Sequence, residues 1–301
     1  MTETTRDAFE QALDRRPVKG RSLYVDAWYR LLRNKAAVVG GLVLLVMVVL
    51  VSMGPLLNPW DHEIPDWDHY STPPSIESGH IFGTDALGRD LFERTMIGGR
   101  ISLLVGLLAT LVSLVIGVSY GAIAGYFGGR VDNLMMRAVD AMYALPFMFL
   151  VILLMVVFGR NIFLIFVAIG AINWLDMARI VRGQTLSLKN KDFVEAARVC
   201  GATEFQIIRR HIIPNLLGVV VVYVTLTIPQ VILVESFLSF LGLGVQEPLT
   251  SWGALVNEGA QELETAPWSL LFPATFLAAT LFAFNFLGDG LRDALDPRDR
   301  L

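Results

Sequence analysis

The sequence of 301 residues has little cysteine and little histidine: one Cys, Cys200, and four His. A single cysteine has no intrachain partner, so a disulfide framework is excluded and Cys200 is predicted to be a small packing residue. With four His and no Ser, His and Asp set within one segment, the sequence gives an enzyme little support, and no catalytic residue is predicted. The phosphate-binding pattern G-x-x-x-x-G-K-[ST] is also absent, so the chain is not expected to hydrolyse ATP itself.

Hydrophobic residues, by contrast, make up 54% of the sequence, and its mean hydropathy of +0.56 lies well above that of soluble proteins. A helix needs roughly 20 apolar residues to cross a bilayer. We therefore predict an all-α polytopic membrane protein with six transmembrane helices, at 36–57, 101–129, 141–159, 161–175, 212–234 and 265–288. The fourth reaches spanning length only if Asp176 and Arg179 lie at the membrane interface.

Lysine and arginine are distributed unevenly between the segments that join these spans. With the N-terminus inside the cell, 20 of the 24 Lys and Arg residues fall on the cytoplasmic side. The positive-inside rule therefore predicts that both termini are cytoplasmic. The first span follows some 35 residues of mixed charge and is longer than the core of a signal peptide, so it is expected to stay as an anchor.

The predicted spans divide the chain into segments. Tyr24, Ala27, Trp28 and Leu31 recur at helical spacing, which predicts an amphipathic helix on the inner membrane surface. The longest extracytoplasmic segment is too short to fold alone without staples, so it is expected to pack against the membrane part or a partner. The segments are a cytoplasmic 1–35, the first span 36–57, an extracytoplasmic 58–100, a five-helix core 101–288 that includes a polar loop at 191–215, and a cytoplasmic tail 289–301.

A stripe of small residues runs along the second predicted span at intervals of four. Small residues on one helix face let another backbone approach closely, so tight helix packing is predicted. A substrate path along this groove is the weaker alternative. The stripe consists of Ser113, Gly117, Gly121, Gly125 and Gly129.

Carboxylates inside or near the spans are the next candidates for function. Glu235 lies deep in an apolar run, six residues after Pro229. Two readings stay open: Glu235 and Pro229 belong to a path or gate, or Glu235 is a hydrated or cross-paired residue of the outer leaflet. Two other carboxylates are predicted to form helix-end pairs with an arginine three residues away, Asp140 with Arg137 and Asp176 with Arg179.

The extracytoplasmic segment also contains a cluster of acidic residues and histidines. Such side chains suit divalent cations, but their spacing matches no known site. We therefore predict no metal site and expect a hydrated acidic loop with interfacial tryptophans. The cluster consists of Asp61, His62, Glu63, Asp66, Asp68 and His69.

The polar loop at 191–215 is too charged to enter the bilayer and is predicted to form two short helices with a bend at Gly201. Asp192 and Glu195 fit an N-cap and capping box. Pro214 ends the segment or begins the next span. The loop is predicted to find no core within the chain for its apolar face, which implies an external groove. That face consists of Phe193, Ala196, Ala197, Cys200, Ile207 and Ile208.

Within this loop "EAARVCGATEFQIIRRHIIPN" resembles the EAA loop of permease subunits in binding-protein-dependent ABC importers. His211 and Ile213 stand where the family has Ile and Leu, as in the peptide-importing branch. The segments "GHIFGTDALGRDLFERTMIGGRISLLVG", "VESFLSFLGLGVQEPLTSWGALV" and "GDGLRDALDP" are similar to the C-type subunit of oligopeptide and dipeptide importers, and the likeness runs from about residue 20 to 297. The matching loop positions are Glu195, Ala196, Ala197, Gly201 and Pro214.

The resemblance implies a type I ABC importer permease fold in the bacterial inner membrane. It further implies a homologous B-type permease subunit, two ATPase subunits that bind ATP and Mg, an extracytoplasmic peptide-binding protein, and an oligopeptide substrate. No cofactor, metal or nucleic acid is expected on this chain, only membrane lipid around it. The loop would be a coupling helix that docks on an ATPase through Asp192, Glu195, Ala196, Ala197, Gly201, His211 and Pro214.

A turn outside the membrane is a second candidate site. It is predicted either to organise the entrance or meet the binding protein, or simply to hold the loop through an Asp–Arg pair. Its residues are Gly83, Thr84, Asp85, Gly88, Arg89 and Asp90. Alternatives for the whole chain are an importer of dipeptides, nickel or another small solute and, from another class, an ion-coupled secondary transporter, for which no paired discontinuous helices are seen.

Overall fold

The computed structural model describes residues 23–159 and 162–295. Within these ranges the regular elements are helices, and the only β-type pairing is an isolated bridge between Thr84 and Asp90. The elements are α2 (Leu23–Arg33), α3 (Lys35–Leu57), α4 (Leu91–Phe127), α5 (Gly129–Tyr143), α6 (Phe147–Phe158), α7 (Ile162–Leu188), α8 (Asp192–Val199), α9 (Glu204–Ile207), the π-helical turn η1 (Ile208–Ile212), α10 (Ile213–Phe240), α11 (Trp252–Gln261) and α12 (Pro267–Leu295).

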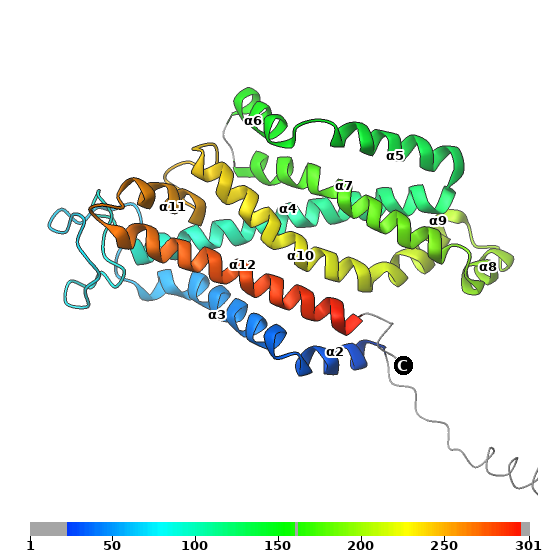
Figure 1. Cartoon of the computed structure of the whole chain (residues 1–301), viewed down its shortest axis with the longest axis horizontal. Helices are drawn as coiled ribbons and strands as arrows, with labels where there is room; N and C mark the ends of the chain where they lie inside the picture. The colour runs from blue at the N-terminus through cyan, green and yellow to red at the C-terminus, as the bar shows by residue number, and fades with distance from the viewer. Residues whose placement is uncertain (1–22, 160–161, 296–301) are drawn as a thin grey trace, which may run out of the picture.

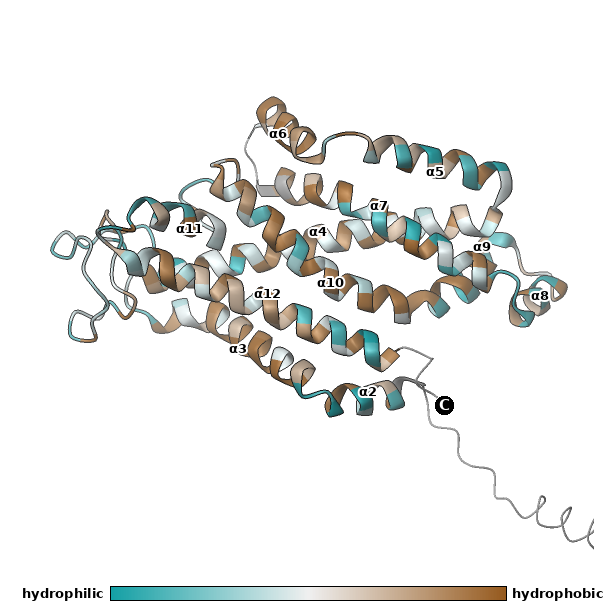
Figure 2. Cartoon of the chain, viewed as in Figure 1, coloured by the Kyte–Doolittle hydropathy of each residue, from teal (hydrophilic) through white to brown (hydrophobic). Residues whose placement is uncertain are grey.

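The long helices α3, α12, α10, α4 and α7 run lengthwise, and α5 and α6 lie outside α7 (Figure 1). The 58–90 segment and α11 gather at one end of the molecule, and α8 and α9 lie at the opposite end. Apolar residues dominate the lengths of the helices between these two ends (Figure 2). This layout places the two predicted sites at opposite ends of the apolar body.

Four helical segments of the described residues are long and apolar enough to cross a membrane: Lys35–Leu57, Leu91–Phe127, Glu204–Phe240 and Pro267–Leu295. The bent pair α5 and α6 raises this number to five if it is counted as one span. Helix α7 covers the predicted fourth span but is not among these segments. The six-span count and the cytoplasmic termini therefore stay predictions.

The second predicted span begins too late in the sequence-based prediction. Helix α4 starts at Leu91, not near residue 101, because the Asp90 carboxylate caps it by accepting a hydrogen bond from the Glu93 N–H at 2.7 Å. The charged residue Arg94 in its first turns is neutralised by tertiary contacts. A search for uncharged runs therefore starts the helix too late, because it ignores such partners.

The third predicted span, 141–159, is broken. Residues 141–143 end α5, and α6 begins only at Phe147, with a bend of 78° between the two helices. Pro146 occupies the N-cap of α6 with an extended backbone. Proline disfavours the helical conformation of the residue before it, which explains why the helix does not continue through this point.

The small-residue stripe forms the interface between α4 and α7, which confirms the packing prediction. A Cβ atom added at Gly117 would lie 2.5 Å from the Met177 Cβ, and one at Gly121 would lie 2.4 Å from the Ala178 carbonyl oxygen. A Cβ atom added at Gly125 would lie 2.7 Å from the Thr185 Cβ. Glycine is required at these positions because the partner backbone leaves no room for a side chain. Gly129 lies beyond the end of α4.

The predicted amphipathic helix is present as α2, which packs against α3 and α12. The Asn34 side chain caps α3 by accepting hydrogen bonds from the N–H groups of Ala36 and Ala37. Trp28 and Tyr29 keep more than half of their surface exposed. Such a half-exposed aromatic helix fits the predicted position at a membrane surface.

Candidate coupling loop and extramembrane turn

The α8–α9 loop, residues 190–207, starts differently from the prediction. Lys191 is the N-cap of α8 and makes no side-chain cap bond, so the predicted Asp192–Glu195 capping box is wrong. Both carboxylates instead lie in the first helical turn, where the helix dipole favours negative charge. The capping box occurs one helix later, where Thr203 and Gln206 exchange hydrogen bonds at the start of α9.

Gly201 joins the two helices with φ at +82°, which confirms the predicted bend. Apart from its two chain neighbours, no atom of the described residues lies within 4 Å of where a Cβ at Gly201 would be, so the backbone conformation is what favours glycine here. His211 lies in η1, and its carbonyl oxygen accepts a hydrogen bond from the Asn215 side chain at 2.6 Å. Pro214 lies in the first turn of α10, as one of the two readings of the sequence expected.

The inner face of the loop is anchored in the chain's own core, so the expectation that this chain offers it no core is wrong. Val194 and Ile207 are fully buried. They join a hydrophobic cluster with Ala122 of α4 and Met177 of α7, and Ala197 packs against its edge. The reason is that α4 and α7 extend far enough along the molecule to cover this side of the loop.

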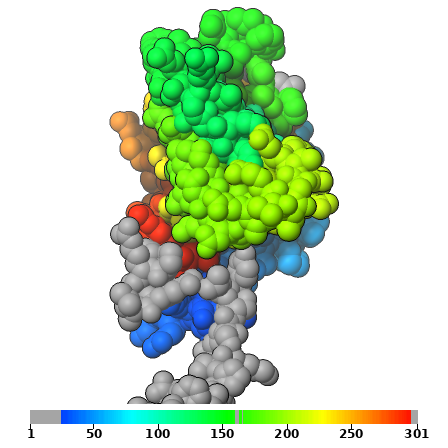
Figure 3. Space-filling model, turned by 90° about the vertical axis from the view of Figure 1, so that its right-hand side faces the viewer, coloured from blue at the N-terminus to red at the C-terminus, as the bar shows by residue number. Residues whose placement is uncertain are grey.

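The outer face of the loop carries apolar side chains that the described chain leaves exposed. Val199 is 88% exposed and Phe205 is 71% exposed. Ala196 and Cys200 are also exposed, so the prediction that Cys200 is a packing residue is wrong. The loop occupies part of the end face that is turned to the viewer in Figure 3. Val199 and Phe205 were missed from the sequence because the apolar face was drawn around Phe193 and Ala197.

At the opposite end, the predicted extramembrane turn is tightly built. Gly83 and Gly88 both have positive φ, and a Cβ at either would lie 2.5 Å from a backbone carbonyl oxygen. The Thr84 hydroxyl donates to the His69 carbonyl oxygen at 2.6 Å and accepts from the Thr72 N–H at 2.9 Å. The turn is therefore closed by its own backbone and hydroxyl contacts.

Two arginines connect this turn to α11 and to the residues that precede α11 in the chain. The Asp85 carboxylate accepts hydrogen bonds from Arg89 Nε at 2.8 Å and from Arg94 Nη1 at 2.6 Å. Arg94 also reaches Glu258 at 2.7 Å, and Arg89 reaches Glu247 at 2.8 Å. Arg94 is only 3% exposed and was not singled out from the sequence. This network matches the simpler reading of the turn, an Asp–Arg pair that holds the loop; the entrance role stays a prediction.

The paired charges shift the pKa values of Arg89 and Glu247. Burial on its own lowers the pKa of Arg89, but the carboxylates of Glu247 and Asp85 outweigh it and raise that pKa above the usual value. The hydrogen bond from Arg89 lowers the pKa of Glu247. Both shifts favour the charged pair.

Asp90 combines several contacts at the start of α4. Its Oδ1 atom accepts from the Asn58 amide at 2.9 Å as well as capping the helix. Its Oδ2 atom lies 2.8 Å from His80 Nδ1, and both side chains are buried. Asp90 therefore connects α4 to the end of α3 and to the turn before Gly83.

The Glu235 carboxylate is fully buried and bonded to hydroxyl groups. It accepts hydrogen bonds from Ser102 of α4 at 3.1 Å and from Ser239 at 2.7 Å. Pro229 is buried within the same helix. Whether either residue bounds a path stays a prediction. The predicted helix-end pairs are wrong, because tertiary packing brings Arg179 to Asp140 at 2.6 Å and the Tyr143 hydroxyl to Asp176.

Sequence comparisons decide which family has this architecture. A family model described as "Binding-protein-dependent transport system inner membrane component" matches residues 117–300. A second model, "N-terminal TM domain of oligopeptide transport permease C", matches residues 22–74. The chain belongs to the binding-protein-dependent transport permeases. The α8–α9 loop lies inside the first matched range, and α2 and α3 lie inside the second.

Curated members of this permease family resemble the chain over its whole length. The oligopeptide transport system permease protein OppC of Haemophilus influenzae is 59% identical over 98% of this chain and 96% of its own length. The protein of the same name from Escherichia coli K12 is 56% identical over 100% and 99%. The dipeptide transport system permease protein DppC of Bacillus subtilis is 49% identical over 91% and 86%.

A solved structure supports the permease fold independently. A chain in an inward-facing structure of the MetNI methionine ABC transporter superposes with a TM-score of 0.52 at 18% identity. The superposition covers 66% of this chain and 94% of that chain. The all-helical permease fold of the ABC importers, expected from the resemblance, is therefore confirmed.

Proposed function

We propose that the chain is one of two membrane subunits of an ATP-driven importer of oligopeptides in the bacterial inner membrane. A homologous B-type permease would complete the path, and two ATPase subunits would bind ATP and Mg. A peptide-binding protein would deliver the substrate from outside. Relatives named as oligopeptide permeases, at 55–59% identity over nearly full length, support this substrate class.

The observation that carries the proposal is the two-sided α8–α9 loop. Val194 fixes its inner face to the core between α4 and α7, while Val199 and Phe205 face outward with most of their surface exposed. A short helix that is firmly attached on one side transmits a push to the helices behind it. Exposed apolar side chains at its tip are suited to a groove in an ATPase subunit.

Asp192, Glu195 and Gly201 support docking in other ways. The two carboxylates are exposed at the start of α8, where they can meet basic groups of a partner. Gly201 sets the angle between α8 and α9, and His211 and Pro214 continue the loop into α10. In this proposal Gly201, His211 and Pro214 orient the loop. Ala196, Val199 and Phe205 make the apolar contact.

A groove of about 810 Å³ supports a path along the membrane part. Polar and apolar side chains line it together, a mixture that suits a peptide backbone with varied side chains better than a purely apolar surface would. We propose that this groove faces the second permease. Its lining includes Gln184, Asn215, Val222, Tyr223, Leu226 and Arg292.

At the other end of the molecule, the turn at residues 83–90 would lie outside the membrane and present a rigid surface to the binding protein. Its rigidity comes from the contacts of Asp85, Arg89 and Arg94. The excess of Lys and Arg in the segments on the α8 side supports this orientation.

The coupling role is tested by Ala196→Asp in the reconstituted four-subunit assembly with its binding protein and a mixed peptide library. An aspartate at this exposed apolar position would place an unpaired charge at the contact, so peptide-stimulated ATP hydrolysis should fall to the basal rate. The matched control is Asn190→Asp, which adds the same charge to an exposed turn of the same loop and should leave stimulation unchanged. Ala196 is preferred to Ala197, because Ala197 also packs against the core.

Cys200 supplies a second readout, as it is the only cysteine and is exposed beside Val199. A maleimide should label it readily in the isolated chain and slowly in the assembly. Equal labelling in both states together with normal stimulation of Ala196→Asp would contradict docking through this loop.

The substrate class is tested separately by uptake into proteoliposomes. Peptides of several lengths, dipeptides and Ni²⁺ are offered in competition, and we expect the longer peptides to be taken up. Preference for dipeptides or Ni²⁺ would leave the importer mechanism standing and change only the substrate. Uptake by the chain without ATPase subunits, driven by an ion gradient, would instead indicate a secondary transporter.

A further inference from the structure

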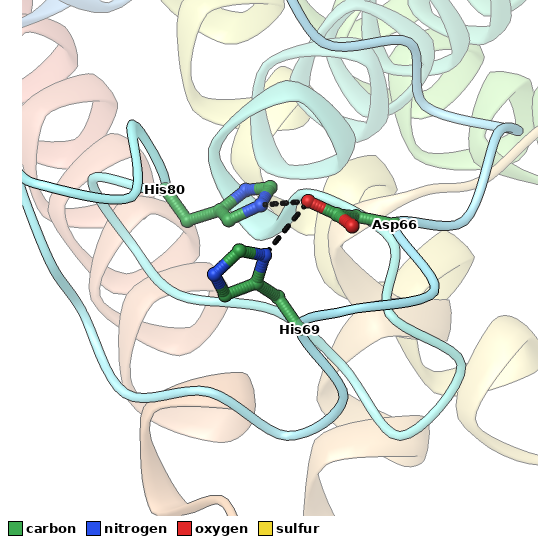
Figure 4. A group of neighbouring side chains, drawn as sticks. All are labelled: Asp66, His69 and His80. Carbon is green, nitrogen blue, oxygen red and sulfur yellow. Dashed lines mark hydrogen bonds and ion pairs between the residues drawn. The ribbon is translucent and has the colours of Figure 1, made fainter.

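Three side chains that the transport function does not use meet in the 58–90 segment. Asp66, His69 and His80 each offer one ligand atom, and these three atoms lie within 4.8 Å of one another. Asp66 Oδ2 lies 2.9 Å from His69 Nδ1 and 3.3 Å from His80 Nε2 (Figure 4). Sequence spacing did not reveal this group, because His80 comes from a separate turn that only the fold brings to the other two.

His80 lies between the carboxylates of Asp66 and Asp90, so negative charge surrounds its ring. The ring is fully buried, its Nδ1 atom lies 2.8 Å from Asp90 Oδ2, and its Nε2 atom faces Asp66 Oδ2. A neutral imidazole has only one N–H group, so it can donate to only one of the two carboxylates. With that proton on Nδ1, the Nε2 lone pair faces a carboxylate oxygen. A cation between Nε2 and Oδ2 removes this repulsion.

Hydrogen bonds with neighbouring groups orient the three side chains, an arrangement that is common in metal sites. Asp66 Oδ1 accepts the Asp68 N–H at 3.0 Å, which leaves Oδ2 available. Asp90 holds the far nitrogen of His80, the carboxylate–histidine arrangement that commonly fixes a metal-binding imidazole. The Trp60 ring stacks on His80 with centroids 4.2 Å apart. Thr84 fixes the backbone of His69 through its carbonyl oxygen.

We propose that Asp66, His69 and His80 bind one divalent transition-metal ion, with Zn²⁺ the best fit. Two imidazoles and one carboxylate suit Zn²⁺, whereas Ca²⁺ and Mg²⁺ prefer oxygen ligands alone. Tetrahedral Zn²⁺ with bonds of about 2.0–2.1 Å separates its ligand atoms by about 3.4 Å, close to the two Asp66 distances. The His69 side chain, 36% exposed, can move to complete the set and leaves the fourth position open to the outside.

The ion would act as a staple in a segment of about thirty residues that has no disulfide and almost no core of its own. It would join the 66–69 stretch to the turn at His80 and, through Asp90, to the start of α4. This inference does not depend on the transported substrate.

The test is a Co²⁺ titration of the purified full-length chain in detergent, with an affinity tag free of histidine. Tetrahedral Co²⁺ is expected to give visible absorption that saturates at one ion per chain and disappears when one equivalent of Zn²⁺ is added. His69→Ala and Asp66→Asn should each weaken Zn²⁺ binding at least tenfold. The matched control is His62→Ala, which removes a histidine of the same segment that is not one of the three proposed ligands and should leave the affinity unchanged.

Folding of the variants is monitored by monodisperse elution, and His69 is chosen because it lies at the exposed edge. Wild-type protein that binds no stoichiometric ion would overturn the proposal. Binding that survives both His69→Ala and Asp66→Asn, or that His62→Ala removes, would also overturn it, because the ion would then sit on the exposed acidic loop.

Discussion

The two ends of this permease differ in the kind of side chain that they bury and expose. At the end that holds the 58–90 segment, buried charged groups have partners within the chain: Asp85, Asp90 and, in the first turn of α4, Arg94 are buried, and each has charged or hydrogen-bonding partners. The α8–α9 loop instead leaves Val199 and Phe205 exposed, although its inner face is buried. The comparison teaches that one end pairs its buried charges within the chain, whereas the other has an apolar surface that the described residues do not cover.

The largest expected effect is at Arg94, the buried arginine that pairs with Asp85. Arg94→Gln removes one of the two arginines that pair with the buried Asp85 and with Glu258, so the free energy of unfolding should fall by up to about 3–5 kcal/mol. Unfolding of the chain in mixed micelles measures this loss. A loss below 1 kcal/mol would show that Arg89 alone can hold Asp85, and the network would then not distinguish this end.

A pair of glycines gives the next largest difference. Gly83 and Gly201 have nearly the same φ, +79° and +82°, so replacing either by alanine should cost about 1–2 kcal/mol of backbone strain. At Gly83 the new Cβ would also lie 2.5 Å from the Thr72 carbonyl oxygen, while Gly201 has open space. Gly83→Ala should therefore destabilise the chain more than Gly201→Ala by about 1 kcal/mol or more in the same unfolding assay. Equal losses would contradict the packing difference between the two ends.

A smaller effect is expected at the exposed edge of the network. The Glu247 side chain is 68% exposed, so Glu247→Gln should reduce the unfolding free energy by less than about 1 kcal/mol. Because the pKa of Glu247 is lowered in the folded state, its contribution is present at neutral pH and is lost as the pH falls through that pKa. Unfolding measured from neutral to acidic pH should show the wild type approaching the variant. A difference that grows on acidification would refute the ion pair.

The smallest stability effect is expected at the tip of the α8–α9 loop. Phe205 is 71% exposed, so Phe205→Ser should change the unfolding free energy of the isolated chain by no more than about 0.5 kcal/mol. Val194→Ala on the buried face is the matched comparison and should cost more, because it leaves a cavity. If Phe205→Ser destabilised the isolated chain as much as Val194→Ala, the outer face would be part of the core and not a free surface.

The sequence predicted features that depend on local geometry. The bend at Gly201 and the small-residue interface of α4 follow from backbone conformation and helical spacing, and both are present. Reasoning failed where a residue depends on a distant partner. It placed the start of the second span at residue 101, because Arg94 and Arg100 interrupt the uncharged run. Nothing near them in the sequence indicates that Glu258 pairs with Arg94 or that carbonyl oxygens of α3 accept hydrogen bonds from Arg100.

The sequence by itself determined the membrane class, the family and the apolar lengths of the helices, because hydrophobicity and local motifs are properties of contiguous residues. Only the tertiary structure decided which face of the α8–α9 loop is buried, where α4 begins, and that His80 joins Asp66 and His69. These features rest on contacts between segments far apart in the chain. Burial and charge neutralisation depend on distance in space, which the order of residues does not specify.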